Sequence, residues 1–225
     1  MRIPGRTAVR ASAAFLASVC LISQALLAYD APLESRSVRE AYFLGQRNDE
    51  KLAKFLESYR KHLPLPEKGP YISEIELLTP YAQVVDVSRQ RTTGYSAQQA
   101  EEDYKKRGDT IQLRVRIELT PTYGEVESSP PTKDSGAKRG VALRPEDFWK
   151  DFQFRLSQGG ETIEPLNIYG EPIFNLSRGG SGGLAGAQVW VEYDARDVGS
   201  SEAVAEVVTP DGVKIAAKFD LAKLR

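Results

Sequence analysis

The sequence predicts a mostly β protein, an antiparallel β-sandwich of immunoglobulin-like architecture preceded by an α-helical N-terminal segment. In residues 110–119, apolar and polar side chains alternate strictly. This pattern indicates a strand with one buried and one solvent-exposed face, as in antiparallel sheets. Residues 70–225 hold about eight short runs of this kind, with turn residues between them, which is typical of a sandwich. Helical spacing of apolar residues is confined mainly to residues 29–69. The Cys…Trp…Cys pattern of antibody domains is missing, so the likeness concerns architecture alone.

Residues 1–28 are expected to be a signal peptide. Arg2, Arg6 and Arg10 precede an uncharged, mostly apolar run at residues 11–28. A basic start followed by a short apolar run with small residues near its end is typical of a secretory signal. The alternative is a retained anchor, since a run of this length just spans a bilayer.

Composition narrows the function classes further. The chain of 225 residues has a formal net charge of -1, so it creates no strong field that would attract nucleic acid or an anionic membrane. The single cysteine, Cys20, lies in the predicted leader, so the mature domain holds no disulfide. We expect an exported protein, periplasmic or extracellular, that contacts a membrane only if its N-terminal segment is retained.

The segment 29–69 is predicted to be helical. Ser37 to Glu40 matches a capping box, and polar residues 46–49 suggest a break before a second helix. The second apolar stripe contains Leu52, Phe55, Leu56, Tyr59 and Leu63, and it ends at Pro64.

The β domain is predicted for residues 70–225. Residues 72–78 and 82–88 are predicted as its first two strands. Ser96 to Gln99 forms a second capping box, and Gly108 is a natural stop, so we expect a short inserted helix at 96–107. Later strands are predicted at 152–156, 161–165, 187–193, 203–208 and 213–219. Two loops are expected, a flexible polar one at 124–140 and a glycine-rich one at 178–186.

The sequence supplies little catalytic chemistry. His62 is the only histidine, and we expect it at the surface, at the end of a helix. Paired carboxylates would be needed for glycoside hydrolysis, and a rim of aspartates could hold Ca²⁺. The candidate carboxylates are Glu146/Asp147, Asp194/Asp197 and Glu101/Glu102/Asp103 for hydrolysis, and Asp194, Asp197 and Asp211 for calcium. No catalytic set, cofactor fingerprint or metal spacing emerges, so we expect neither an enzyme nor a cofactor.

Three aromatic residues are candidate ligand contacts. Trp149, Trp190 and Tyr193 can form a platform for a sugar ring or a peptide. On its strand Trp190 belongs to the opposite set from Val189 and Val191, so it faces outward or lies beneath the helical segment. Packing against the helices is the simpler interpretation.

The leading functional hypothesis is an exported, non-enzymatic binding or assembly module of the bacterial cell envelope. Its partner would be an envelope protein or a glycan, and strand addition at a sheet edge is one available binding mode. The alternative is a carbohydrate-binding or carbohydrate-active protein that uses exposed tryptophans or paired carboxylates.

Overall fold

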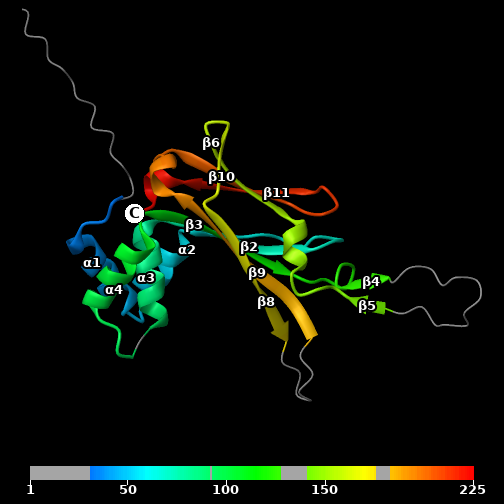
Figure 1. The fold of residues 1–225 in the computed structure, drawn as a ribbon, viewed down its shortest axis with the longest axis horizontal. Helices are drawn as coiled ribbons and strands as arrows, with labels where there is room; N and C mark the ends of the chain where they lie inside the picture. The colour runs from blue at the N-terminus through cyan, green and yellow to red at the C-terminus, as the bar shows by residue number, and fades with distance from the viewer. Residues whose placement is uncertain (1–30, 92, 128–140, 176–182) are drawn as a thin grey trace, which may run out of the picture.

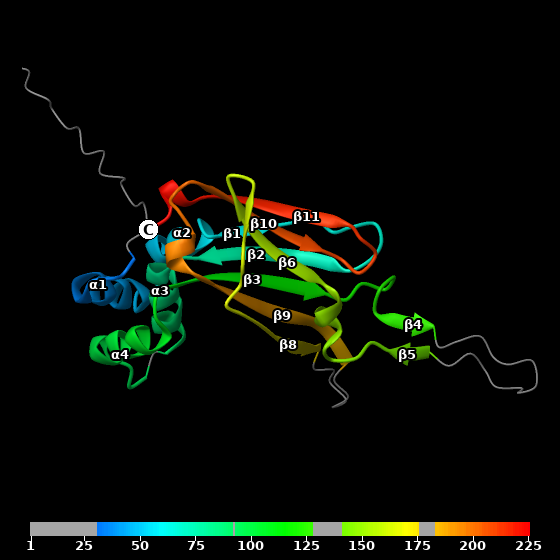
Figure 2. The same ribbon diagram turned by 45° about the horizontal axis from the view of Figure 1, so that its top comes forward.

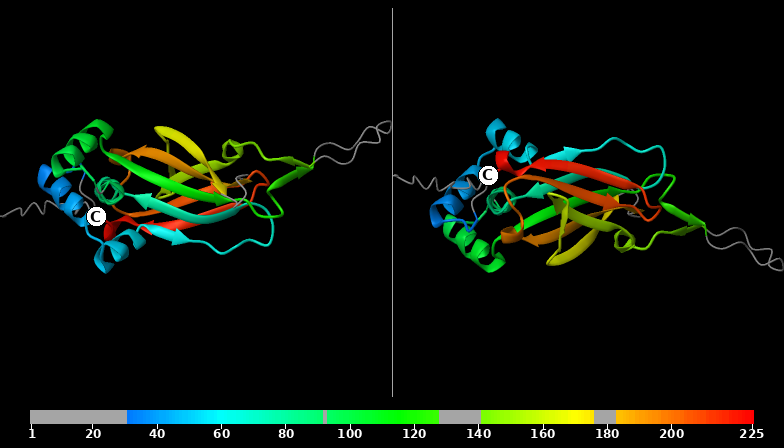
Figure 3. Two further views of the ribbon diagram at one scale, coloured as in Figure 1. Left: turned by 90° about the horizontal axis from the view of Figure 1, so that it is seen from below. Right: turned by 90° about the horizontal axis from the view of Figure 1, so that it is seen from above.

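A computed structural model describes residues 31–91, 93–127, 141–175 and 183–225. The described chain is mostly β, with two main antiparallel sheets, a small two-stranded ribbon and four α-helices. The helices lie at one end of the sheets, near the C-terminus, and the ribbon projects from the other end (Figures 1 and 3).

The larger sheet has five strands in the order β1-β2-β3-β9-β8 (Figure 2). Every neighbouring pair is antiparallel. The strands are β1 (Arg60–His62), β2 (Tyr71–Leu78), β3 (Thr110–Glu118), β8 (Asn167–Asn175) and β9 (Gly183–Asp194).

The smaller sheet has four strands in the order β11-β10-β6-β7. Its strands are β6 (Gln153–Gln158), β7 (Glu161–Ile163), β10 (Glu202–Val208) and β11 (Lys214–Asp220). The ribbon pairs β4 (Glu125–Glu127) with β5 (Val141–Leu143). Three single-turn 3₁₀ helices complete the elements: η1 (Phe148–Asp151), η2 (Ala195–Asp197) and η3 (Leu221–Lys223).

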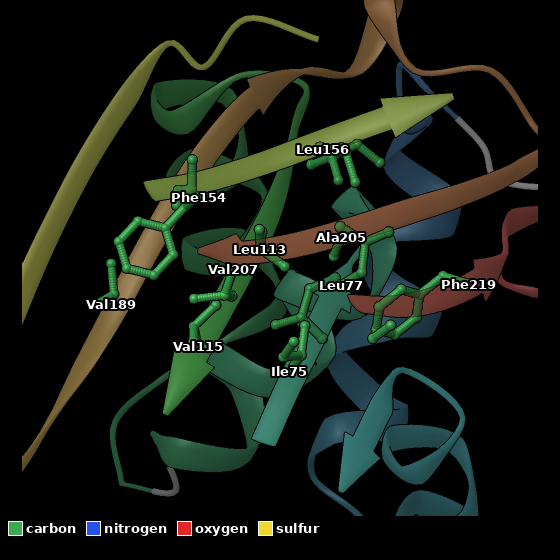
Figure 4. Close-up of a cluster of buried hydrophobic side chains, with 14 of the residues drawn as sticks. Ile75, Leu77, Leu113, Val115, Phe154, Leu156, Val189, Ala205, Val207 and Phe219 are labelled. Carbon is green, nitrogen blue, oxygen red and sulfur yellow. The ribbon is translucent and has the colours of Figure 1, made fainter. Parts of the chain in front are cut away.

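The two sheets share one hydrophobic core, which contains side chains from both (Figure 4). Its members alternate along each strand, as in β3, where Ile111, Leu113, Val115 and Ile117 are fully buried. Side chains from the smaller sheet, such as Leu156 on β6 and Val207 on β10, belong to the same buried cluster. The alternation at residues 110–117 therefore reports a real inner face, as the sequence predicted.

The helices form a second buried cluster. They are α1 (Ser35–Gly45), α2 (Glu50–Glu57), α3 (Pro80–Gln90) and α4 (Ala97–Arg107). The cluster is centred on Val38, Ala41, Leu52, Tyr81, Val84, Val85, Ala100 and Tyr104. At the crossing of α1 and α3, a Cβ built on Gly45 would lie 2.4 Å from the Val85 carbonyl oxygen, so only glycine permits this close approach.

The prediction of a strand at residues 82–88 is wrong, because these residues lie in α3. Thr79 caps the helix by accepting a hydrogen bond from the Ala82 amide, and Pro80 occupies the first turn, where its missing N–H is no loss. All residues from Pro80 to Asp86 are buried, so the helix shows no polar face that would reveal its period.

Two predictions for the N-terminal segment also need correction. Helix α1 begins at Ser35, and its N-cap, Glu34, makes no side-chain cap hydrogen bond, so Ser37 lies inside the helix rather than at a capping box. Helix α2 ends at Glu57, and residues 60–62 pair with β2 instead of continuing the helix. The pairing with β2 satisfies backbone groups that a lone helical turn would leave exposed.

The capping box at Ser96 is confirmed, with both reciprocal hydrogen bonds present, and α4 ends just before Gly108. The predicted leader at residues 1–28 lies outside the described residues, as do most of the 124–140 loop and of the 178–186 loop. Within the described ranges, no helix is long and apolar enough to cross a membrane.

Candidate functional site

Strand β8 is an exposed edge of the five-stranded sheet. It pairs with β9 along one side, and no other described strand pairs with its far side. Large apolar side chains stand exposed on it or beside it: Leu166 (61%), Ile168 (41%), Tyr169 (37%) and Phe174 (45%). A long, apolar, unpaired edge is a template for another strand.

The other edges of the described sheets carry more protection. Strands β1 and β7 have three residues each. Strand β11 is longer, but it carries the exposed lysines Lys214 and Lys218. Short length and lysine are common devices against unwanted strand pairing. Strand β8 has nine residues and a single charge, Glu171. Pro172 and a register shift between Ile173 and Phe174 protect its second half, so the free edge is residues 167–171.

On the outer face of the sheet, Tyr169 and Trp190 are direct cross-strand neighbours. Their rings stack, with centroids 5.2 Å apart and planes at 11°. One face of each ring is therefore covered by the other. Because Trp190 covers the ring of Tyr169 from the β9 side, the other face of the ring lies on the side of the free edge. The Tyr169 hydroxyl lies 3.5 Å from Nε2 of Gln112.

On the inner face, Trp149 lies against the backbone of β8. A Cβ built on Gly170 would come within 2.5 Å of the Trp149 ring, so the glycine makes room for the indole. Trp149 also lines an open groove of about 470 Å³ between β6 and β8. The lining residues are Trp149, Lys150, Phe152, Gln153, Phe154, Arg155 and Ile168.

The groove lies beside the part of β6 that β7 does not cover. Strand β7 pairs only with Leu156–Gln158 of β6, which leaves residues 153–155 without a described neighbour on that side. The edge of β8 borders the same groove through Ile168. This side of the molecule therefore combines the free edge of β8 with a largely apolar groove.

Carboxylates lie close to Tyr169. Burial raises the pKa of Tyr169, and the nearby charges of Glu192 and Glu171 raise it further, whereas Arg114 and Arg107 oppose that shift. Glu171 is exposed on β8, and Glu192 faces outward on β9. Arg114 lies further from the edge, on β3. On the outer face, the edge strand thus carries a carboxylate, whereas Arg114 lies two strands away from the edge.

Arg114 belongs to a buried network that joins α3 to the sheet. Its guanidinium donates to Asp86 at 2.6 Å and to Gln112 at 2.7 Å, and Glu76 lies 3.8 Å away. Burial alone would raise the pKa of Asp86, but the charge and hydrogen bond of Arg114 and the hydrogen bond of Arg89 lower it below its ordinary value. We assign this network a structural role.

The structure does not bring the three predicted aromatic residues together. Trp149 and Trp190 flank the β8–β9 pair on opposite faces, whereas Tyr193 is fully buried in the core. The platform expected from Trp149, Trp190 and Tyr193 is therefore not formed, because Tyr193 shares the inward parity of Val191. Trp190 packs on Tyr169 of β8 rather than on the helices.

Sequence reasoning missed Tyr169. Its neighbours Gly170 and Pro172 are turn-like residues that conceal a strand at 167–175. Proline within a sheet is nonetheless typical of edge strands. Pro172 was thus the local signal that could have identified the edge.

The carboxylate hypotheses find no support in the geometry. Asp194 accepts hydrogen bonds from the side chain and the amide of Arg196, which lower its pKa to about 2. Asp197 precedes β10 and Asp211 follows it, so the proposed calcium ligands stand at opposite ends of that strand. Among the described residues, no three His, Cys, Asp or Glu side chains are placed to hold a metal.

Two of the other candidate carboxylates form ion pairs with lysines at the surface. Asp147 pairs with Lys150 at 3.0 Å, and Glu101 with Lys105 at 2.7 Å. His62 is exposed on β1 rather than at the end of a helix.

Comparison with known proteins adds no relative: no family model, curated protein or solved structure matches the chain.

Proposed function

We propose that this protein is a non-enzymatic binding module that takes up an extended peptide segment of a partner by strand addition at β8. The observation that carries the proposal is the unpaired edge at residues 167–171 with exposed Ile168 and Tyr169. Main-chain hydrogen bonds to the edge would supply affinity, and pockets for alternate side chains would supply specificity. The groove beside Trp149 offers such a pocket.

The carbohydrate alternative has weaker support. A sugar platform needs an open aromatic face. Tyr169 and Trp190 cover one face of each other by stacking, and Trp149 packs against Gly170. The open face of Tyr169 is turned toward the strand edge, where a peptide side chain would lie.

The cellular setting is also part of the proposal. The basic and apolar leader at residues 1–28 supports export to the periplasm or beyond, with an envelope protein as the partner. We further propose an immunoglobulin-like sandwich for residues 70–225, because two antiparallel sheets with a common core are its basic plan.

The test has two steps. Peptides that bind the chain are first selected from a random library, and the amide hydrogen exchange of the chain is then measured with and without each peptide. Peptides that bind are expected to slow exchange within residues 167–175, because an added strand bonds the outward N–H groups of β8. The variant Ile168→Lys, which places a charge at the groove, should abolish this protection. Val213→Lys is the matched control, since Val213 is also exposed and apolar (52%) but lies in the β10–β11 turn.

Two results would contradict the proposal. One is peptide binding that leaves exchange in β8 unchanged. The other is binding that survives Ile168→Lys as well as it survives Val213→Lys. Selective retention on a glycan array that depends on Tyr169 would instead support the carbohydrate alternative.

A further inference from the structure

We propose that the segment added to β8 is amphipathic, with basic side chains on the outer face of the sheet and apolar side chains on the inner face. This inference rests on the proposed strand addition and specifies the chemistry of the partner. It follows from how the two faces differ at one edge.

The outer face presents rows of cross-strand neighbours that end at β8. One row runs Arg114–Trp190–Tyr169. The neighbouring row runs from Arg116 through Gln188 to Glu171. A new strand would extend each row by one side chain, placed about 5 Å from its neighbour on β8.

Tyr169 and Glu171 define what that next side chain should be. The open face of the Tyr169 ring would receive a guanidinium or an ammonium group by a cation–π contact. Glu171 is exposed, and within the described chain no cation lies at ion-pair distance from it. Opposite charges at cross-strand positions stabilise a sheet, whereas like charges oppose pairing. Lysine or arginine fits both rows, and an acidic segment fits neither.

The charges around this edge also favour positively charged side chains in the partner. Besides Glu171, the acidic residues Glu164 on the approach to β8 and Glu192 on β9 lie nearby. Two cations lie along these rows, both on β3: Arg114 is bound to Asp86 at 2.6 Å and is mostly buried, and Arg116 is exposed but pairs with Glu118 at 3.2 Å. A basic partner therefore meets carboxylates first.

The inner face has the opposite chemistry. The groove beside β8 has an apolar lining formed by Trp149, Phe152, Phe154 and Ile168. Lys150 and Arg155 also line it. Its volume of about 470 Å³ leaves room for apolar side chains from alternate positions of an added strand. The two cations would repel a basic side chain directed inward. The outer face of the sheet and the groove on the inner face thus together specify which face of the added segment is charged.

Three synthetic peptides of the length of β8, nine residues, test the inference. The first alternates lysine with valine, the second glutamate with valine, and the third lysine with serine. Each carries a fluorophore, and binding to the full chain is measured by anisotropy at low and at physiological salt. Hydrogen exchange locates the bound peptide.

The lysine–valine peptide should bind about tenfold more tightly than either other peptide, because several cross-strand pairs change sign or lose apolar contact. Salt should weaken its binding. Glu171→Lys should reverse the order of the two valine peptides. Glu118→Lys is the matched control, since Glu118 is also partly exposed on this outer face but lies on β3.

The outcomes separate the two proposals. Equal binding of the lysine–valine and glutamate–valine peptides, with β8 protected from exchange, would overturn the charge inference and leave strand addition intact. Equal binding of the lysine–valine and lysine–serine peptides would overturn its apolar half. If no peptide protects β8, strand addition itself is wrong.

Discussion

Removing the carboxylate of Asp86 should destabilise the fold more than any other single charge deletion on the outer face of the five-stranded sheet. Asp86 lies on α3, and its side chain is 5% exposed beside an Arg114 side chain that is 17% exposed. The two groups are joined at 2.6 Å. The variant Asp86→Ala leaves the guanidinium desolvated without its closest counter-ion.

The size of the effect follows from the geometry. Breaking a buried ion pair by deleting one partner costs about 3–5 kcal/mol. Glu76, 3.8 Å from the guanidinium, remains and offsets part of the loss. We therefore expect Asp86→Ala to lower the free energy of unfolding by about 3 kcal/mol.

The assay is urea unfolding at pH 7, followed by far-ultraviolet circular dichroism. Glu118→Ala is the control, because its pair with Arg116 is made at 3.2 Å with both side chains over 40% exposed. That variant should change the free energy by less than about 0.5 kcal/mol. The double variant Asp86→Leu/Arg114→Met should recover much of the loss, since no unpaired charge stays buried.

The pH dependence gives a second readout. The folded-state pKa of Asp86 lies below its ordinary 3.8, so its contribution is complete above that value and is lost as the pH falls through the folded-state pKa. The difference between the natural chain and Asp86→Ala should narrow in this acidic range. A cost at pH 7 below about 1 kcal/mol, the scale of an exposed pair, would show that Asp86 and Arg114 do not behave as a buried ion pair.

Three further changes probe other parts of the fold, each by urea unfolding. Ser96→Ala removes the capping hydroxyl of α4 and should cost about 1 kcal/mol; no loss would mean that the cap is dispensable. Gly45→Ala places a Cβ 2.4 Å from the Val85 carbonyl oxygen and should cost about 1–3 kcal/mol, unless α1 can shift freely. Tyr59→Phe removes hydrogen bonds of 2.7 and 3.0 Å to the Arg225 backbone and should cost about 1–2 kcal/mol. Because burial raises the pKa of Tyr59 to about 12, its neutral form stabilises the fold below pH 10, and this contribution is lost between pH 10 and 12. The natural chain should therefore lose more stability than Tyr59→Phe over that range, and parallel losses would contradict this assignment.

Some elements could be predicted from the sequence because their signals are local. The alternation at 110–119 corresponds to β3, and the capping box at Ser96 starts α4. The turn at 209–212 likewise joins β10 to β11. In each case, the residues that signal the element also make its defining contacts within a few positions of one another.

Elements whose packing or pairing partners are distant in the sequence could not be predicted. Residues 82–88 read as a strand because the burial of nearly all of them removes the helical pattern. Residues 60–62 became a strand because β2 lies beside them. For both segments, the deciding contacts come from chain far away in sequence.

The candidate site divides in the same way. The local pattern of the sequence places Trp149 and Trp190 near strands. It also places Trp190 and Tyr193 on opposite sides of one strand, because side-chain direction alternates along a strand. Three other features depend on the folded arrangement: β8 is an edge strand, Tyr169 stacks on Trp190, and a groove lies beside Trp149. The physical reason is that strand order and sheet separation depend on long-range pairing and packing, which no local pattern encodes.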